Sequence, residues 1–248
     1  MGKEVIILDI DNTIKPSGVK VGTEMAKTLK AVVDAGYWLV FVSGVEFRVI
    51  KQDVLDFFAI TPQVKKRVIV FSTTGAEMHL FDGSAWKTVY TNPLKSDEKT
   101  GIVNAINTVI KEHKKIIPFQ GARLSVQDRK CQYTVSLLNH STSRRIKTSW
   151  DRKMVKRKLI QHDLEKRLKG FEVNLSGHAS LDITRKGLDK AYAIKRLKQH
   201  LKLPSSRMIF FGDSVFRGGN DYSVKKSGVK AVKIKDEKET LKILKKLL

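Results

Sequence analysis

Two aspartates stand two residues apart after a short apolar run near the start of the chain. Asp9 and Asp11 follow Val5–Leu8, a run bounded by charged residues and typical of a buried strand. In an extended chain, residues two apart point the same way. Such a pair can hold a divalent cation, or one carboxylate can act as a nucleophile while the other manages protons. A helix cap or a turn is the structural alternative for either aspartate.

Acidic and hydroxyl side chains follow two further predicted strands. Ser43 comes after the apolar run Tyr37–Val42, and Asp213 comes after Met208–Phe211, with Asp221 in the same loop. The carboxyl ends of parallel strands line the crevice in which doubly wound sheets bind ligands. The acids could complete a hard-cation site there, whereas the Ser-Gly pair at residues 43–44 alone is also typical of an ordinary turn.

Two lysines flank the start of a predicted helix that precedes the last strands. Lys186 and Lys190 stand on either side of the first residues of the helical pattern Leu188–His200. Either ammonium group could reach a phosphate bound at the edge of the sheet. The pattern alone does not choose between them.

Strand and helix patterns alternate in the two outer parts of the chain and predict the scaffold for these residues. We predict an α/β fold, with a Rossmann-like core of residues 1–81 and 186–248 built on a parallel sheet. Residues 82–185 read as an inserted α+β unit with antiparallel strands. A hairpin with a turn at Asp82-Gly83 would begin this insert, and Asp151 would cap its very basic helix.

The composition excludes some classes of protein. With 248 residues, 48 Lys plus Arg and 25 Asp plus Glu, the net charge is +23, which indicates an anionic partner or a generally lysine-rich surface. The single cysteine, Cys131, excludes an intramolecular disulfide and favours the reducing cytoplasm. No apolar run approaches the ~20 residues of a membrane span, so we expect no membrane partner. Residues 144–158 hold eight Lys or Arg and one Asp, as a solvated helix face or an anion-attracting rim would.

Taken together, the order and strand-end placement of these motifs resemble the haloacid dehalogenase superfamily. The first motif is residues 9–13, Ser43 matches the second, Lys190 the third, and Asp213 with Asp221 the fourth. Residues 184–190 and 211–222 further resemble the eukaryotic-type phosphomannomutases and the bacterial subfamily IIB hydrolases close to them. The likeness covers nearly the whole chain, and the insert falls where that branch carries a C2B-type cap.

The resemblance implies phosphoryl transfer through an aspartyl phosphate. Asp9 would attack phosphorus, and Asp11 would protonate the leaving oxygen and then deprotonate the incoming water or sugar hydroxyl. Mg²⁺ would be held by Asp9, the Asp11 backbone carbonyl and Asp213, with Asp221 close by. Ser43 and Lys190 would hold the transferring oxygens. Lys190 is preferred to Lys186 because the family lysine opens its helix in an Asp-Lys-Ala pattern.

The predicted cap both matches and departs from the phosphomannomutase pattern. Arg129, Ser180 and Asp182 match cap positions that bind the sugar phosphate, although a plain polar strand face is the alternative for each. Cap and core arginines of the mutases lack counterparts near Gly18 and His140. A mutase must hold a sugar by either of two phosphates and needs fixed cations. We therefore expect a Mg²⁺-dependent phosphatase acting on a small phosphorylated substrate, a sugar phosphate, with phosphomannomutase as the alternative. Nucleic-acid binding is a remote alternative, because clustered carboxylates do not help bind a polyanion.

Overall fold

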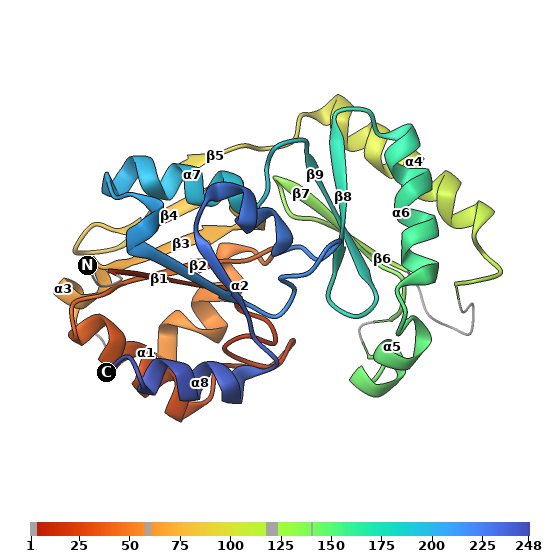
Figure 1. The fold of residues 1–248 in the computed structure, drawn as a ribbon. Coiled ribbons are helices and arrows are strands. Elements are labelled where there is room, and N and C mark those ends of the chain that lie inside the picture. Colours follow the sequence, from red (N-terminus) through yellow and green to blue (C-terminus); the bar gives the residue numbers. More distant parts are fainter. Residues whose placement is uncertain (1–3, 58–60, 118–123, 140) are drawn as a thin grey trace. The chain divides into compact units, whose positions relative to one another are not determined.

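The computed structural model describes residues 4–57, 61–117, 124–139 and 141–248 of the chain. They form two compact units, one made of Met1–Thr91 and Leu188–Leu248 and the other of Asn92–Gly187. The fold is α/β, with a mixed, mostly parallel seven-stranded sheet in the first unit and a separate antiparallel four-stranded sheet in the second (Figure 1). The predicted α/β class and the inserted antiparallel unit are confirmed.

The first unit is built on the seven-stranded sheet, in the order β11-β10-β1-β2-β3-β4-β5. Its five parallel strands are β1 (Val5–Leu8), β2 (Trp38–Val42), β3 (Val68–Ser72), β10 (Met208–Gly212) and β11 (Lys230–Lys233). The central position of β1, with neighbours on both sides, explains why all four of its residues are buried apolar side chains.

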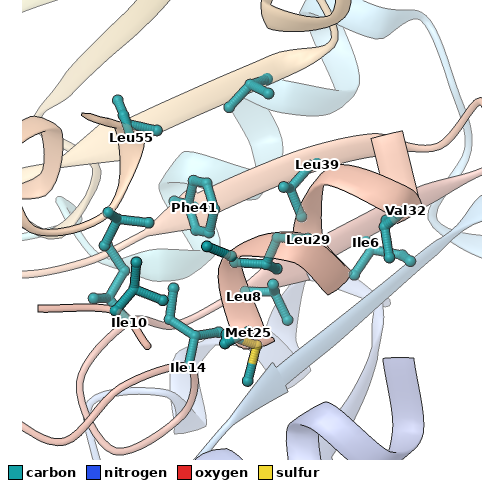
Figure 2. Close-up of a cluster of buried hydrophobic side chains, with 14 of the residues drawn as sticks. Ile6, Leu8, Ile10, Ile14, Met25, Leu29, Val32, Leu39, Phe41 and Leu55 are labelled. Atoms are coloured by element: carbon teal, nitrogen blue, oxygen red, sulfur yellow. The ribbon is translucent and has the colours of Figure 1, made fainter. Parts of the chain in front are cut away.

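Alternate residues of the central strands pack on opposite faces of this sheet, as the period of two requires. Ile6 and Leu8 join a core cluster with α1, while Val5 and Ile7 join another with α7. Figure 2 shows the first cluster, in which Leu29 of α1 lies over the sheet. The helices of this unit are α1 (Thr23–Asp34), α2 (Phe47–Asp53), α3 (Pro62–Lys65), α7 (Lys190–Leu201) and α8 (Glu237–Lys245), with 3-10 turns at Leu55–Phe57, Thr73–Gly75, Ser205–Arg207 and Tyr222–Ser227.

The predicted hairpin at Asp82 is present, but both of its strands belong to the first unit. β4 (Glu77–Phe81) pairs antiparallel with β3, and β5 (Trp86–Thr91) pairs antiparallel with β4. The Asp82 carboxylate accepts hydrogen bonds from the backbone of Ser84 and Ala85, each 2.8 Å long, and closes the turn. The second unit therefore starts at Asn92, not at residue 82, because the hairpin extends the large sheet.

A buried polar network joins β3, β4 and β5. Ser72 Oγ and Thr91 Oγ1 each donate to the Glu77 carboxylate over 3.0 Å, and Ser72 Oγ lies 2.9 Å from His79 Nε2. Burial alone would raise the pKa of Glu77, but the hydrogen bonds from His79, Ser72 and Thr91 outweigh it and lower the pKa to about 2. The carboxylate is thus a structural anion in the folded protein.

The second unit is a sheet covered by helices on one face. Its strands follow the order β6-β7-β9-β8, and every neighbouring pair is antiparallel. Asp151, predicted to cap the basic helix, does not occupy its N-cap position, which is Met154, because the helix begins only at Val155. Its carboxylate still accepts from the backbone N–H groups of Lys156 and Arg157 in the first turn. The elements are α4 (Ser96–Glu112), β6 (Ser125–Asp128), β7 (Gln132–Ser136), α5 (Arg144–Trp150), α6 (Val155–Arg167), β8 (Phe171–Ser176) and β9 (Ser180–Arg185). Among the described residues, no helix combines the length and the apolar character that crossing a bilayer requires.

Candidate active site

The site begins where β1 ends, at the centre of the large sheet. The backbone N–H of Asp9 donates to the carbonyl of Phe211 on β10 over 2.9 Å, so the strand pairing itself fixes this residue. The chain then turns tightly, with Asn12 at a φ of 60°, a left-handed conformation that asparagine tolerates. Asp9 is buried, whereas the side chain of Asp11 is 30% exposed. The two carboxylates thus differ in environment although they are two residues apart.

A buried lysine contacts two of the predicted carboxylates. Lys190 is the first residue of α7, and its Nζ lies 2.5 Å from Asp9 Oδ1 and 2.5 Å from Asp221 Oδ1. The preceding residue, Asp189, caps the helix by accepting from the backbone N–H of Tyr192 over 2.9 Å. Lys186, the alternative at the sequence level, is exposed and belongs to the second unit. Lys190 is therefore the lysine that contacts the carboxylates.

Three carboxyl groups converge beside this lysine. One oxygen each of Asp9, Asp213 and Asp221 lies within 4.8 Å of the others. The Asp221 carboxylate also accepts from the backbone N–H of Ser214 over 3.0 Å. Gly212 makes room for it, since a Cβ at that position would lie 2.3 Å from Asp221 Oδ2. The sequence placed these acids at one sheet edge, and the structure brings them together.

The cluster holds three carboxyl groups and one ammonium group, and this imbalance of charge, together with burial, shifts the pKa values of its members. Burial, followed by repulsion from Asp221 and Asp213, raises the pKa of Asp9 to about 8 despite the attraction of Lys190. Burial and Asp221 also raise the pKa of Asp213. Although burial opposes it, the attraction of Asp221 and Asp9 raises the pKa of Lys190. Three carboxyl groups facing one ammonium group are a cluster that another cation would stabilise.

The donor chemistry of this cluster fits Mg²⁺. Carboxylate oxygens are ligands that this ion prefers, and three are available from Asp9, Asp213 and Asp221. The Asp11 carboxylate is not one of them, because Asp11 Oδ1 accepts a hydrogen bond of 2.7 Å from Lys15 Nζ. This agrees with the expectation that Asp11 would serve the ion only through its backbone carbonyl, which stays a prediction.

Two residues of the first motif connect the cluster, and sequence reasoning gave them no role. Asn12 Nδ2 donates to Asp213 Oδ2 over 3.3 Å. Thr13 Oγ1 donates to Asp9 Oδ2 over 3.3 Å and accepts from the backbone N–H of Asp213 over 3.2 Å. These contacts tie the end of β1 to the end of β10. Both residues directly follow Asp11 in the sequence, and this adjacency is the feature from which their proximity to the carboxylates could have been predicted.

Lys15 is a second buried cation that the sequence reasoning missed. Its side chain is 4% exposed, and besides Asp11 it lies 3.7 Å from Asp53 Oδ2. It therefore fixes the carboxylate of Asp11 away from the three-carboxylate cluster. Lys15 stands in the stretch after the first motif that carries an arginine in the mutases, and its position four residues after Asp11 is compatible with an ion pair between the two.

Ser43 lies at the end of β2, beside β1. Leu8 and Phe41 are register partners, so Asp9 and Ser43 both emerge from the same edge of the sheet. The backbone N–H of Ser43 donates to Phe71 over 3.0 Å, and its buried hydroxyl accepts from the backbone N–H of Val45 over 3.2 Å. This places a hydroxyl among the strand ends that carry the carboxylates.

The three residues predicted to bind substrate in the cap all lie in the second unit. Asp182 Oδ1 accepts from Thr134 Oγ1 over 2.7 Å, and Ser180 Oγ lies 3.2 Å from Ser136 Oγ. Both residues belong to β9 and, being two apart, share the polar face of the sheet. Arg129 directly follows β6 and donates to Gln127 Oε1 over 2.8 Å. His140, where a mutase arginine was found to be missing, lies outside the described residues.

Comparisons with known proteins agree with this architecture. Residues 6–242 match a family model described as haloacid dehalogenase-like hydrolase, and no curated protein is a significant match. The IMP-bound, N-terminally truncated IMP-nucleotidase of Plasmodium falciparum is 14% identical, with a TM-score of 0.70 over 98% of this chain and 68% of that chain. Its ATP-bound structure is 15% identical, with a TM-score of 0.69 over 98% and 60%. A haloacid dehalogenase-like hydrolase from Bacteroides thetaiotaomicron is 15% identical, with a TM-score of 0.63 over 99% and 100%. At these identities the similarity to solved structures establishes the fold alone.

Proposed function

Since the chain belongs to the haloacid dehalogenase-like hydrolases, we propose that it is a Mg²⁺-dependent phosphatase of small phosphorylated substrates. The observation that carries the proposal is the contact of Lys190 with Asp9 inside a cluster of three carboxyl groups. A carboxylate that attacks a phosphate dianion meets charge repulsion, and a fixed cation beside the nucleophile offsets it. The burial of both groups strengthens this effect.

In the proposed reaction, one carboxylate oxygen of Asp9 forms a bond to phosphorus while the bond from phosphorus to the leaving oxygen breaks. Asp11 gives a proton to that leaving oxygen and takes one from the water that then attacks the aspartyl phosphate. The second attack breaks the bond between phosphorus and Asp9 and releases inorganic phosphate. Lys190 and Ser43 are proposed to hold the transferring oxygens, and Lys15 to hold the Asp11 carboxylate.

The cation would be held by Asp9, Asp213 and Asp221, with the backbone carbonyl of Asp11. When bound, it would supply Lewis-acid polarisation of the phosphoryl oxygens. Asn12 and Thr13 orient two of these carboxylates, so the proposed ligands are hydrogen-bonded on their outer side.

The second unit is proposed to recognise the part of the substrate that leaves. Its polar strand face carries Ser180 and Asp182, with Arg129 at the adjoining turn, which matches the phosphomannomutase-like and subfamily IIB resemblance. Hydroxyl and carboxylate groups suit the hydroxyls of a sugar phosphate. We propose the core as residues 1–91 and 188–248 and the cap as residues 92–187, and we expect action in the reducing cytoplasm, as the buried Cys131 favours.

Phosphomannomutase is the second candidate, because the first and fourth motifs would serve it equally. The mutase arginines that lack counterparts near Gly18 and His140 favour hydrolysis over the mutase, because Lys15, the buried cation near Gly18, is already engaged with Asp11 and Asp53. A nucleoside monophosphate is a further substrate candidate, prompted by the fold shared with an IMP-nucleotidase. Nucleic-acid binding is disfavoured, because the carboxylate cluster would repel a polyanion.

The test measures phosphate release from hexose 1- and 6-phosphates and from IMP, beside a coupled assay for hexose-phosphate isomerisation. We expect release to exceed isomerisation even with added hexose 1,6-bisphosphate. Asp9→Asn should reduce release on the order of a thousandfold or more while the thermal unfolding transition persists. Activity of that variant within about tenfold of wild type would remove Asp9 from the nucleophile role, since losing a nucleophile costs far more.

A further inference from the structure

A short strained turn follows β3 at the same sheet edge as the proposed active site. Thr73, Thr74 and Gly75 have φ values of 46°, 59° and 89°, so three consecutive residues are left-handed. Glycine adopts this conformation readily, but β-branched residues do so only against a steric cost. Such a conformation persists where the surroundings impose it, and this often happens at functional sites.

One side of the turn is bonded to the loop that carries Ser43. The backbone N–H of Thr74 donates to the carbonyl of Ser43 over 2.8 Å, and that of Thr73 donates to the carbonyl of Val45 over 3.1 Å. Val45 in turn donates its N–H to the Ser43 hydroxyl. The turn is thus bonded to the backbone of Ser43 and to that of Val45, whose N–H the predicted phosphate-binding hydroxyl accepts.

The other side of the turn packs against the start of α7. A Cβ on Gly75 would lie 2.8 Å from the Cβ of Ala193 and 3.1 Å from the backbone carbonyl oxygen of Asp189. Asp189 is the cap residue directly before Lys190. The hydroxyl of Tyr90 on β5 donates to the carbonyl of Gly75 over 2.9 Å and holds the turn from a third direction.

We propose that the turn of residues 73–75 is a positioning element that sets Ser43 relative to Lys190. The inference rests on the proposed function, in which these two side chains hold the same transferring phosphoryl group. The turn is bonded to the strand end carrying Ser43 and packed on the helix end carrying Lys190. Any added atom at Gly75 therefore displaces one end from the other.

Gly75→Ala tests the element against a matched control elsewhere in the first unit. Gly36 has a φ of 92°, almost that of Gly75, but a Cβ there would meet nothing within 4 Å. Both substitutions impose the same backbone strain, and only Gly75→Ala pushes on α7. With p-nitrophenyl phosphate as substrate, we expect kcat/KM of Gly75→Ala to fall about tenfold to a hundredfold, the effect of a misplacement near 1 Å, and weaker competitive inhibition by inorganic phosphate. Gly36→Ala should keep the activity of the wild type.

Variants at Ala193 keep the proposal testable if Gly75→Ala does not fold. Adding Ala193→Gly to Gly75→Ala removes the closer of the two clashes and should restore part of the activity. If Gly75→Ala does not fold, Ala193→Ser presses on the same contact from the helix side and should lower activity more than Gly36→Ala does. Equal activity of the Gly75 or Ala193 variant and the Gly36 control would overturn the proposal.

A readout independent of catalysis separates this inference from the proposed function. Amide hydrogen exchange at Thr74 reports the bond to the Ser43 carbonyl whether or not the protein is a phosphatase. We expect faster exchange at Thr74 in Gly75→Ala than in wild type and Gly36→Ala. Unchanged exchange overturns the positioning role. If exchange at Thr74 is faster in Gly75→Ala but the wild-type protein releases no phosphate, the contact between the turn and Ser43 is supported and the proposed phosphatase activity is refuted.

Discussion

Replacing Lys190 should make the stability of the protein depend on added metal ions. Its Nζ contacts Asp9 and Asp221 at 2.5 Å each, and none of its side chain is exposed. Lys190→Met keeps an unbranched apolar chain of similar length but leaves three clustered carboxyl groups without the ammonium. The folded state must then either protonate these groups or accept their repulsion.

The expected magnitude follows from the burial of the pair. Removing one partner of a buried ion pair costs about 3–5 kcal/mol. A protein of this size loses about 2–4 °C of Tm per kcal/mol, so we expect Tm to fall by about 6–20 °C at pH 7 in the presence of chelator. The pKa of Asp9 is already raised to about 8, so protonation of Asp9 relieves part of the repulsion among the carboxylates. The fall in Tm caused by Lys190→Met should therefore become smaller as the pH falls.

Thermal unfolding at a series of Mg²⁺ concentrations measures this effect. Mg²⁺ should raise the Tm of Lys190→Met more than that of the wild type, because the variant has the greater uncompensated negative charge. Lys186→Met removes an exposed lysine and serves as the control, with the Tm of the wild type. A fall of less than about 2 °C, far below the cost of an unpaired buried charge, would refute the reasoning. If Mg²⁺ leaves the difference in Tm between Lys190→Met and the wild type unchanged, the proposed metal site is refuted.

Three further predictions concern the cluster and the core. Gly212→Ala should weaken Mg²⁺ activation and lower kcat about a hundredfold by displacing Asp221, whereas Gly101→Ala, which meets nothing within 4 Å, should be harmless in the same titration. Phosphatase activity should vanish in excess chelator and return with Mg²⁺ but poorly with Ca²⁺, whose longer bonds misplace the nucleophile; full activity in chelator would contradict this. Glu77→Gln should lower Tm at pH 7, and the gap should close as the pH falls from 4.5 towards 2, because the lowered pKa of Glu77 stabilises the fold only while it is ionised; a constant gap would contradict it.

The carboxylate cluster could be predicted because strand ends carry a strong signal. Val5–Leu8 and Met208–Phe211 are apolar runs that end directly at acidic residues, and parallel pairing places such ends at one sheet edge. The side chain of Lys190 was harder to assign from residues alone, and only the family resemblance preferred it to Lys186. The contacts of Lys190 in the structure explain that preference physically.

Other parts of the site depend on contacts that a local pattern does not contain. Lys15 reads as a surface lysine, and its role arises only because the loop after β1 brings it to Asp11 and Asp53. The sequence predicted the hairpin of β4 and β5, but it did not predict that β4 would pair with β3 of the large sheet. Alternating residues specify a strand and a turn, while the choice of sheet depends on the free edge of β3.

The position of β10 has a consequence for how the protein is made. Register pairs such as Val5 with Met208 join β1 to a strand about two hundred residues later in the chain. During synthesis, β1 and β2 leave the ribosome long before β10, while the contiguous second unit of residues 92–187 is complete in between. The end of β1 that carries Asp9 therefore lacks β10, and with it Asp213 and Asp221, until the final quarter of the chain has emerged. Closing such a long loop is slow, so the nascent chain should assemble the carboxylates of the proposed metal site last.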